Sequence, residues 1–216
     1  MAASSGDLSH SFTDLMTSLA VIFILLLVAT LNNAFSESDE AIQDLRKEVS
    51  EELRKLNLTL TQDPDDPYTQ IINLDEDKVK FDFNRDVLRP EGKKLIGHLF
   101  FVLTPKLCDK GLYSKLESVI IEGHTDSSGN RTTDGKLRNV KLSQDRAYAV
   151  MNEAFTSIND SKPENVDCLR LLASATGRGS NRPLKDRPDD ASRRVEVKIR
   201  VKAGLNIAKL LPRSGP

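Results

Sequence analysis

The sequence contains no Trp, and only two Cys and three His among its 216 residues. Two Cys cannot build a disulfide-dense scaffold, and together with three His they cannot supply several zinc sites. The formal net charge of −1 argues against a dedicated nucleic-acid-binding protein, because such proteins are normally basic. Charged residues make up 29% of the chain, so wholesale disorder is not expected. The length suits one ordinary domain with an additional segment.

Basic residues are absent from positions 1–35, and the stretch Leu15–Leu31 carries no charge at all. A helix over residues 11–33 is long enough to cross the roughly 30 Å hydrocarbon core of a bilayer. A cleavable signal peptide is the alternative, but it needs a basic start and a small-x-small cleavage site, and the sequence offers neither. We therefore predict a retained transmembrane helix at 11–33. Charge alone leaves its orientation open, because the first basic residue, Arg46, comes after the helix.

Asp14 lies one turn inside this apolar segment and shares one helix face with Ser11, Thr17 and Ser18. Lipid offers no hydrogen-bond partners, so this polar face must contact protein or water. An ionised carboxylate near the bilayer centre costs about 2.5–3.5 kcal/mol on insertion scales and is usually functional. Two interpretations stay open: Asp14 caps the helix at the headgroup boundary, or it carries a proton or cation and changes its own charge.

Residues 34–66 are expected to form an acidic linker. Over positions 36–66 ten Asp and Glu stand against four Lys and Arg. Apolar residues at spacings of three and four predict an amphipathic helix, and these are Ile42, Leu45, Val49, Leu53 and Leu56. Such a helix is marginal as a coiled coil alone, but it would pair with a second copy tethered in the same membrane. A solvated spacer is the alternative.

A Pro-rich break at residues 63–67 marks the start of a domain, which we place at 67–204 between the linker and a tail at 205–216. Residues 1–10 form the segment before the transmembrane helix. The predicted elements are strands at 79–83, 119–121, 169–175 and 195–201, with helices that begin at Pro90 and Ser143. The predicted fold class is therefore α+β: a single N-terminal transmembrane helix, an amphipathic linker helix and a βαβαββ domain.

Two features of this domain are not explained by folding. Arg146 would lie in the first turn of the helix predicted at Ser143, where a cation opposes the helix dipole unless an anion docks there. Asp126, in the segment Gly123-His124-Thr125-Asp126, follows a buried strand, where ligands of α/β proteins commonly bind. Asp126 would take an ammonium group and Arg146 a carboxylate, which suits the zwitterionic head of an amino acid. The alternative is an Asp126–Arg146 salt bridge without a ligand.

Five motifs occur between residues 71 and 202: VKFDFNRDVLRPEG, IIEGHTDSSG, NVKLSQDRA, TGRGSNRPL and SRRVEV. In order and spacing they resemble the OmpA/MotB-like peptidoglycan-binding family. This resemblance implies that Asp126 and Arg146 hold the diaminopimelate of the wall peptide stem, with Thr125, Asn139 and Arg194 at the same site. The family's Asn-Arg-Arg is Ser-Arg-Arg here, a departure at its first position.

The N-terminal segment SFTDLMTSLAVIFILLLV resembles the single transmembrane helix of MotB-type stator subunits, in which an Asp near the helix start carries the coupling ion. The match falls on Asp14, with Thr17 and Ser18 beside it. The chain as a whole resembles the stator-type subunits of the Zorya anti-phage defence system. That resemblance implies a bacterial inner-membrane protein with a cytoplasmic N-terminus and a periplasmic domain. It also implies a homodimer inside a ring of polytopic MotA-like or ZorA-like subunits, with protons crossing at Asp14.

Alternative functions are a flagellar or gliding stator subunit and a passive inner-membrane tether to peptidoglycan. We expect no enzyme, cofactor or metal site, because His10, His98 and His124 are scattered without metal-ligand spacing. The basic region at 136–216 is expected to meet anionic wall polymer, and no nucleic-acid partner is expected.

The two cysteines are candidates for a disulfide. Cys108 follows the first predicted helix of the domain and Cys168 precedes its third strand. In a βαβαβ order these two connections fall at the same end of the sheet. The two residues could therefore pair in an oxidising compartment, or both could stay free thiols.

Overall fold

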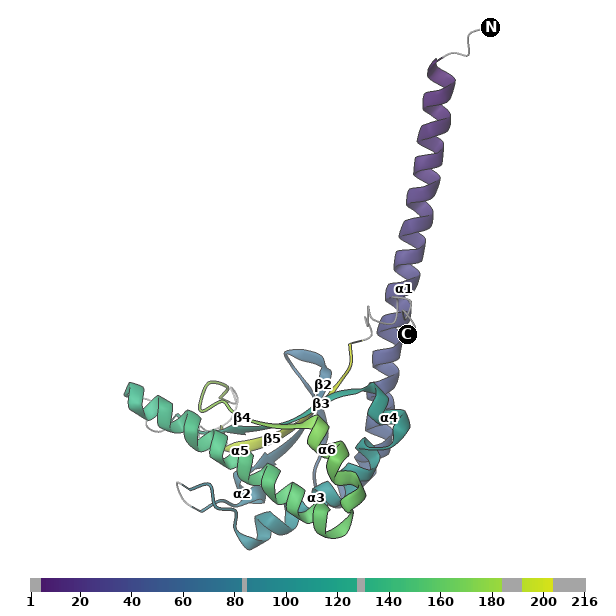
Figure 1. Cartoon of the computed structure of the whole chain (residues 1–216). Helices are drawn as coiled ribbons and strands as arrows, with labels where there is room; N and C mark the ends of the chain where they lie inside the picture. Colours follow the sequence, from purple (N-terminus) through teal and green to yellow (C-terminus); the bar gives the residue numbers. More distant parts are fainter. Residues whose placement is uncertain (1–4, 83–84, 128–130, 184–191, 204–216) are drawn as a thin grey trace, which may run out of the picture. The chain divides into compact units, whose positions relative to one another are not determined.

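The structure, a computed structural model, describes residues 5–82, 85–127, 131–183 and 192–203, without the side chains of residues 5–11 and 32–37. The chain divides into two compact units, one made of residues 1–39 with 203–216 and the other of residues 40–202. Helix α1 (Ser5–Lys55) begins in the first unit and ends in the second, and all other described helices and strands belong to the second unit (Figure 1).

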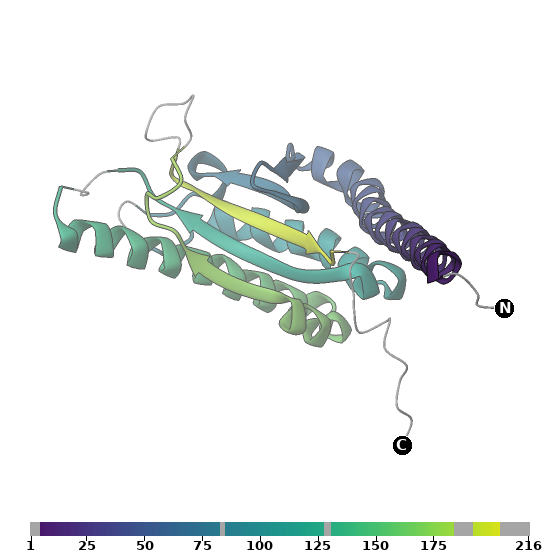
Figure 2. The ribbon, with the colours of Figure 1, turned by 90° about the horizontal axis from the view of Figure 1, so that it is seen from above.

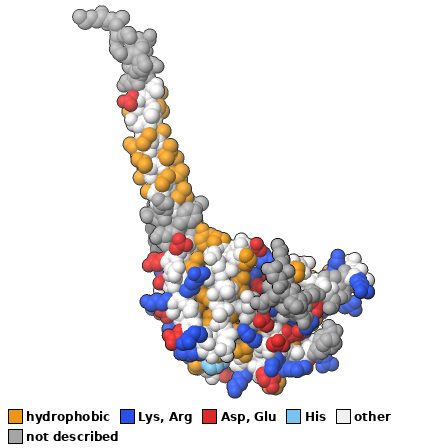
Figure 3. Space-filling model, turned by 180° about the vertical axis from the view of Figure 1, so that it is seen from behind, with side chains coloured by type: hydrophobic (Ala, Val, Ile, Leu, Met, Phe, Trp, Pro, Cys, Tyr) orange, Lys and Arg blue, Asp and Glu red, His pale blue; other side chains and the backbone are white. Residues whose placement is uncertain are grey.

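In the first unit, α1 contains a 20-residue apolar stretch, Phe12–Leu31, with a mean hydropathy of 2.4. None of this stretch is buried, and Figure 3 shows hydrophobic side chains exposed along it. Its length and composition suffice to cross a bilayer. The helix therefore fits the transmembrane segment predicted at 11–33.

The second unit is built on one five-stranded sheet. Its strands are β1 (Leu60–Asp63), β2 (Asp66–Asp75), β3 (Leu116–His124), β4 (Ala173–Gly177) and β5 (Arg194–Val201). The strand order is β1-β2-β5-β3-β4. Only the β3–β4 pair is parallel, and the other neighbouring pairs are antiparallel. The last strand in sequence, β5, therefore lies in the middle of the sheet, hydrogen-bonded to both β2 and β3.

Helices cover one face of this sheet. They are α2 (Glu76–Val79), α3 (Pro90–Leu107), α4 (Lys110–Lys115), α5 (Thr133–Ser161), the 3₁₀ turn η1 (Pro163–Asn165) and α6 (Val166–Leu172). The two long helices α3 and α5 run side by side beneath the strands (Figure 2). Alternate residues of β5 pack in one core with them: Val195, Val197, Ile199 and Val201 are all at most 1% exposed.

The predicted order βαβαββ is confirmed in β2, α3, β3, α5, β4 and β5, but the first strand was misplaced. The alternating segment predicted as a strand at 79–83 instead ends helix α2 at Val79 and turns at Lys80, whose φ is 49°. Phe81 then makes one isolated bridge with Leu88, and residue 83 lies outside the described residues. The alternating pattern at 79–83 gave a wrong prediction, because the strand that pairs in the sheet is β2, just upstream of it. The third strand likewise begins at Ala173, because the preceding residues from 166 are helical.

Helix α5 also begins ten residues before the predicted Ser143. Its N-cap is Thr132, whose hydroxyl accepts a hydrogen bond from the Gly135 N–H at 3.0 Å. Residues 133–142 are mostly polar and include a glycine, so their sequence carries little helical periodicity. Ser143 lies inside the helix, where its Oγ donates to Val140 O at 2.7 Å and accepts from the Gly179 N–H at 2.8 Å. The argument that Arg146 sits in a first helical turn was therefore wrong.

Two glycines let α5 lie directly against the strand ends. A Cβ atom on Gly123 would come within 2.1 Å of Ser143 O, and one on Gly177 within 2.4 Å of the Gln144 backbone nitrogen. Both distances are far below van der Waals contact, so these positions require the absence of a side chain. The close approach fixes the middle of α5, including Arg146, at the carboxyl ends of β3 and β4.

The predicted amphipathic linker helix is present, but its partner is the domain of the same chain. Leu45, Val49 and Leu53 are fully buried and belong to the same hydrophobic core as the sheet. Around them, Lys106 Nζ contacts Glu48 Oε2 at 2.9 Å, and Lys115 Nζ contacts Asp44 Oδ2 at 2.7 Å. The apolar face is thus covered within one chain, so neither a solvated spacer nor a pairing helix describes it. The compact unit begins at residue 40 rather than at 67.

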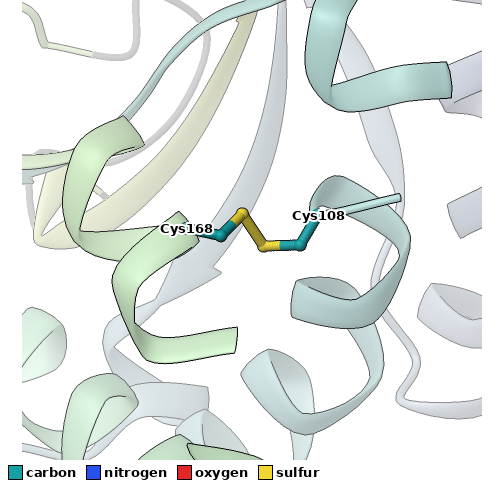
Figure 4. The surroundings of a disulfide bond; sticks show 2 residues. All are labelled: Cys108 and Cys168. Atoms are coloured by element: carbon teal, nitrogen blue, oxygen red, sulfur yellow. A yellow bond between two sulfur atoms is a disulfide. The ribbon is translucent and has the colours of Figure 1, made fainter. Parts of the chain in front are cut away.

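A disulfide joins Cys108, at the C-terminal cap of α3, to Cys168 in α6 (Figure 4). The two Cα atoms lie 6.0 Å apart, and the residues are 60 positions apart in sequence. Closing a loop of this length restricts the unfolded chain, an effect of about 2–4 kcal/mol for typical disulfides. Of the two possibilities left open by the sequence, the structure has the bonded pair.

Because the linker helix is part of the core, Leu45→Ala should lower the free energy of unfolding of the domain by about 2–5 kcal/mol, the usual cost of a buried Leu truncation. Chemical denaturation of the full chain in detergent would measure this change. The exposed neighbour Gln43→Ala serves as the control in the same helix. A Leu45→Ala effect no larger than that of the control would mean that the helix is detached from the domain.

Candidate functional site

The candidate site forms where three strand ends meet at one edge of the sheet. Glu76 directly follows β2, Arg193 directly precedes β5, and Asp126 follows β3 by two residues. Because β5 is antiparallel to both neighbours, its start lies beside the ends of β2 and β3. The Glu76 N–H donates to Arg193 O at 3.2 Å, which holds these two backbones together.

Four charged side chains of alternating sign occupy this edge. Arg193 Nη1 donates to Asp126 Oδ2 at 2.7 Å, and Arg193 Nε donates to Glu76 Oε2. The second carboxylate oxygen of Glu76 then lies 3.7 Å from Arg146 Nη2. The row reads Asp126, Arg193, Glu76, Arg146. Arg193 bridges two carboxylates, and this raises the pKa of its guanidinium.

Arg146 is the most enclosed member of the row, with only 4% of its surface exposed. Its Nε donates to Arg85 O at 3.0 Å, and its guanidinium carbon lies 4.9 Å from the centroid of the Phe81 ring. Burial is the main cause that lowers the pKa of Arg146, and the nearby charge of Glu76 opposes that shift. Among the described residues this buried guanidinium has one backbone acceptor and one carboxylate at 3.7 Å, so its five N–H groups have capacity for a further anionic partner.

The structure brings the two predicted ligand residues, Asp126 and Arg146, to one site, but not into contact. Among the described residues, ion pairs connect Asp126 to Arg193 and Arg146 to Glu76, and none joins Asp126 directly to Arg146. The alternative of a simple Asp126–Arg146 salt bridge is therefore wrong. Sequence reasoning reached Asp126 from its position after a buried strand and Arg146 from the helix dipole, and the motifs then pointed to the same pair. The helix-dipole argument rested on a helix start at Ser143, whereas α5 begins at Thr133.

The supporting residues divide between this site and elsewhere. Asn139 Nδ2 donates to Asp126 O at 3.4 Å. The Thr125 N–H donates to Gly179 O at 2.9 Å, while its buried Oγ1 has no hydrogen-bond partner in the described part of the chain. Arg194 instead donates from Nε to Glu196 Oε1 at 2.6 Å. Successive residues of an extended chain point to opposite faces of the sheet, so Arg193 points to the site and Arg194 points away from it. This alternation was the signal that sequence reasoning missed.

Arg194 belongs to a second cluster of charges, which lies on the other face of β3 and β5. Lys198 Nζ donates to Glu122 Oε1 at 2.7 Å and lies 3.3 Å from Glu196 Oε2. Arg178 Nε donates to Glu122 Oε2 at 2.9 Å. Burial raises the pKa of Glu196, but the adjacent His124 and the charges of Arg194 and Lys198 outweigh it and lower the pKa to about 2. Both carboxylates are therefore ionised and held by cations.

The same cluster contains donor atoms of a kind that bind metals, because Glu122, His124 and Glu196 offer ligand atoms within 4.8 Å of one another. The ammonium group of Lys198, however, already contacts the carboxylates of both Glu122 and Glu196. A divalent ion would have to share this space with a buried lysine, which is electrostatically unfavourable. The residues therefore do not fit a metal ion, and the arrangement is a compensated ionic network.

The predicted ion-translocating residues lie on the other unit. Asp14, Thr17 and Ser18 are all exposed on α1. Thr17 Oγ1 donates to Thr13 O at 2.8 Å within the helix. Among the described residues, no cation and no hydrogen-bond donor contacts the Asp14 carboxylate.

Comparison with known proteins defines the class first by fold. The chain matches no known family model. The periplasmic domain of MotB from Helicobacter pylori aligns with a TM-score of 0.50, at 18% identity, over 71% of this chain and 84% of that one. The OmpA-like domain of FopA1 from Francisella tularensis covers 67% of this chain and 81% of its own, at 21% identity and a TM-score of 0.44. The fold is thus that of the MotB periplasmic domain, in agreement with the fold that the motifs predicted.

A comparison of sequences identifies a relative that is similar over most of the chain. The chain is 28% identical over 205 residues to the Zorya protein ZorB from Escherichia coli O139:H28. The match covers 88% of this chain and 78% of that protein. The resemblance to Zorya subunits expected from the sequence is thereby confirmed.

The ionic network predicts a particular acid sensitivity. Glu196 titrates at about 2 in the folded chain, against an ordinary value of 4.5, so the unfolded state binds more protons between these pH values. Stability should therefore fall as the pH drops from about 4.5 to 2. Glu196→Gln should show a shallower fall, measured by chemical denaturation at a series of pH values. The exposed Glu91→Gln is the control, and an unchanged slope in Glu196→Gln would contradict the assignment.

Proposed function

We propose that this chain is the peptidoglycan-anchored, stator-type subunit of a proton-driven inner-membrane motor of the Zorya anti-phage system. The observation that carries the proposal is the similarity to ZorB over 88% of the chain. Residues 40–202 make up only about three-quarters of the sequence, so the match must extend beyond the compact domain. A likeness limited to the wall-binding fold would not require this.

Two structural features support an inner-membrane protein with its N-terminus in the cytoplasm and its domain in the periplasm. The apolar stretch Phe12–Leu31 has the length of one membrane crossing. The disulfide between Cys108 and Cys168 belongs to the compact domain, and disulfides persist in oxidising compartments such as the periplasm. In the proposed orientation the domain would lie on the side of the membrane where peptidoglycan is found.

The charged row at the sheet edge supports binding of the wall peptide. Diaminopimelate carries an ammonium and a carboxylate group on one carbon, so it needs an anion and a cation at a fixed separation. Asp126, two residues after β3, and Arg146, in α5, supply these two charges, and no ion pair of the described residues joins them directly. Both are held by packing and backbone hydrogen bonds, which pre-organises them for a ligand. Thr125 and Asn139 lie beside Asp126.

Asp14 is the proposed ion carrier, with Thr17 and Ser18 on the same face of the helix. Two copies of this helix would stand inside a ring of polytopic MotA-like or ZorA-like subunits, which would enclose the polar face that lipid cannot satisfy. Protonation and release of Asp14 would let protons cross the membrane. One charge that crosses 100 mV releases about 2.3 kcal/mol, which is enough to drive stepwise rotation. The wall-bound domains would resist the torque.

The wall site predicts that Asp126→Asn and Arg146→Ala each weaken binding to purified peptidoglycan sacculi by more than about tenfold, because a charged hydrogen bond contributes about 1.5–3 kcal/mol. Co-sedimentation of the full chain in detergent measures this binding. Asp126→Asn keeps the side-chain volume, so it tests the site even if Arg146→Ala fails to fold. Arg170→Ala, on the exposed face of α6, removes a positive charge elsewhere and should bind normally. Undiminished sedimentation of both site variants would refute the site.

The ion-carrier role predicts that Asp14→Asn abolishes protection in a phage plating assay but leaves complex assembly intact. Purification with the native operon would show two copies of the variant inside the ring, as for wild type. Asp39→Asn, further along the same helix, is the matched control and should protect. Protection by Asp14→Asn, or recovery of the wild-type chain without a polytopic partner, would favour the passive tether. A flagellar partner in the complex would reassign the motor.

A further inference from the structure

The partners that Asp126 and Arg146 have in this structure carry the same charges as the proposed ligand. Asp126 is bound by the guanidinium of Arg193 at 2.7 Å, in the place of an ammonium group. Arg146 has the carboxylate of Glu76 at 3.7 Å, in the place of the ligand carboxylate. Arg193 and Glu76 also bind each other, as an ammonium and a carboxylate on one carbon would be joined. The inner pair thus reproduces the charge pattern of a zwitterion.

We propose that Glu76 and Arg193 form an internal substitute for the zwitterionic wall peptide, which the peptide must displace in order to bind Asp126 and Arg146. This inference rests on the wall-binding function proposed above. It assigns a role to Glu76, which follows β2 and lies outside the motifs, and to Arg193, which precedes β5 and lies in the SRRVEV motif but was not among the expected site residues. Both act by competition with the ligand.

Differences in burial indicate which pair stays and which pair moves. The outer side chains are well enclosed, with Arg146 5% and Asp126 12% exposed. The inner side chains are more open, with Glu76 29% and Arg193 36% exposed. Long side chains that are already about one-third exposed can rotate toward solvent at little cost, because water there replaces their partners. Asp126 and Arg146, the outer pair, therefore stay in place to bind the ligand, and Glu76 and Arg193, the inner pair, are displaced.

Such an exchange needs no rearrangement of the fold. The backbones of Glu76 and Arg193 are joined by an N–H to O hydrogen bond of 3.2 Å at the β2–β5 edge, and this bond does not involve the side chains. The inner pair is neutral as a whole, and so is the head of the ligand, so the site keeps its net charge through the exchange. A ligand with only one of the two charges would leave Asp126 or Arg146 with its internal partner.

This competition lowers the apparent affinity of the site, because only the fraction of molecules with the inner pair displaced can bind. Neutralising either inner residue should raise that fraction. Glu76→Gln removes the carboxylate that competes for Arg146, and Arg193→Gln removes the cation that competes for Asp126. If about 80–90% of molecules are closed, each variant should bind about five- to tenfold more tightly than wild type.

The test measures binding of a soluble muropeptide that contains meso-diaminopimelate to the full chain in detergent, by calorimetry. The proteins are wild type, Glu76→Gln, Arg193→Gln and the matched controls Glu91→Gln and Arg170→Gln, which change exposed charges on α3 and α6. Thermal melting verifies that each variant is folded. Tighter binding by both inner-pair variants, with wild-type affinity in both controls, is the expected result.

Other outcomes separate this inference from the proposed function. Equal or weaker binding by Glu76→Gln and Arg193→Gln, while wild type binds, would overturn the competition and leave the wall-binding function in place. Weaker binding would make the inner pair direct ligand contacts. No binding by wild type but clear binding by the inner-pair variants would support the competition in its strongest form. No binding by any folded protein would overturn both the inference and the wall-peptide site.

Discussion

The contact between helix α5 and the ends of strands β3 and β4 is the constraint on which the site depends. The helix backbone at Ser143 lies so close to Gly123 that a Cβ atom there would stand 2.1 Å from a carbonyl oxygen. Gly177, on the neighbouring strand β4, likewise leaves room for the backbone of α5. With the helix fixed at this height, Arg146 projects over the edge where β2 and β3 end and β5 begins. A helix held farther from the sheet would separate Arg146 from Asp126.

The central strand β5 distributes charge to both faces of the sheet. Arg193, just before it, joins the row at the sheet edge, while Arg194 and Lys198 neutralise Glu196 and Glu122 on the opposite face. The second cluster is closed, because buried carboxylates and buried cations face each other at hydrogen-bonding distance. The row at the sheet edge is more open, because Glu76 is 29% and Arg193 36% exposed. Similar residue types thus form a closed ionic network on one face and a more open row of charges at the edge of the sheet.

The linker helix and the disulfide extend the domain beyond its motifs. Leu45, Val49 and Leu53 bury an entire helix face in the core, and the bond from Cys108 to Cys168 ties α3 to α6. Both features add resistance to unfolding of the domain. The amphipathic pattern in the sequence predicted the helix correctly. It could not predict the partner, because an apolar stripe has the same spacing whether it packs on its own domain or on a second copy.

The sequence by itself determined the apolar helix around Asp14, the α+β class and the βαβαββ order, and it pointed to Asp126 and Arg146 through motifs that resemble those of the OmpA/MotB-like family. These follow from periodicity, composition and motif spacing, which are local properties of the chain. Only the tertiary structure decided that α5 begins at Thr133, that β2 replaces the strand expected at 79–83, and that Glu76 and Arg193 stand between the two predicted ligand residues. The physical reason is that Glu76, Asp126, Arg146 and Arg193 are distant in sequence. These side chains come together only through the order of the strands in the sheet and the distance between α5 and the sheet. No local sequence pattern encodes either of these.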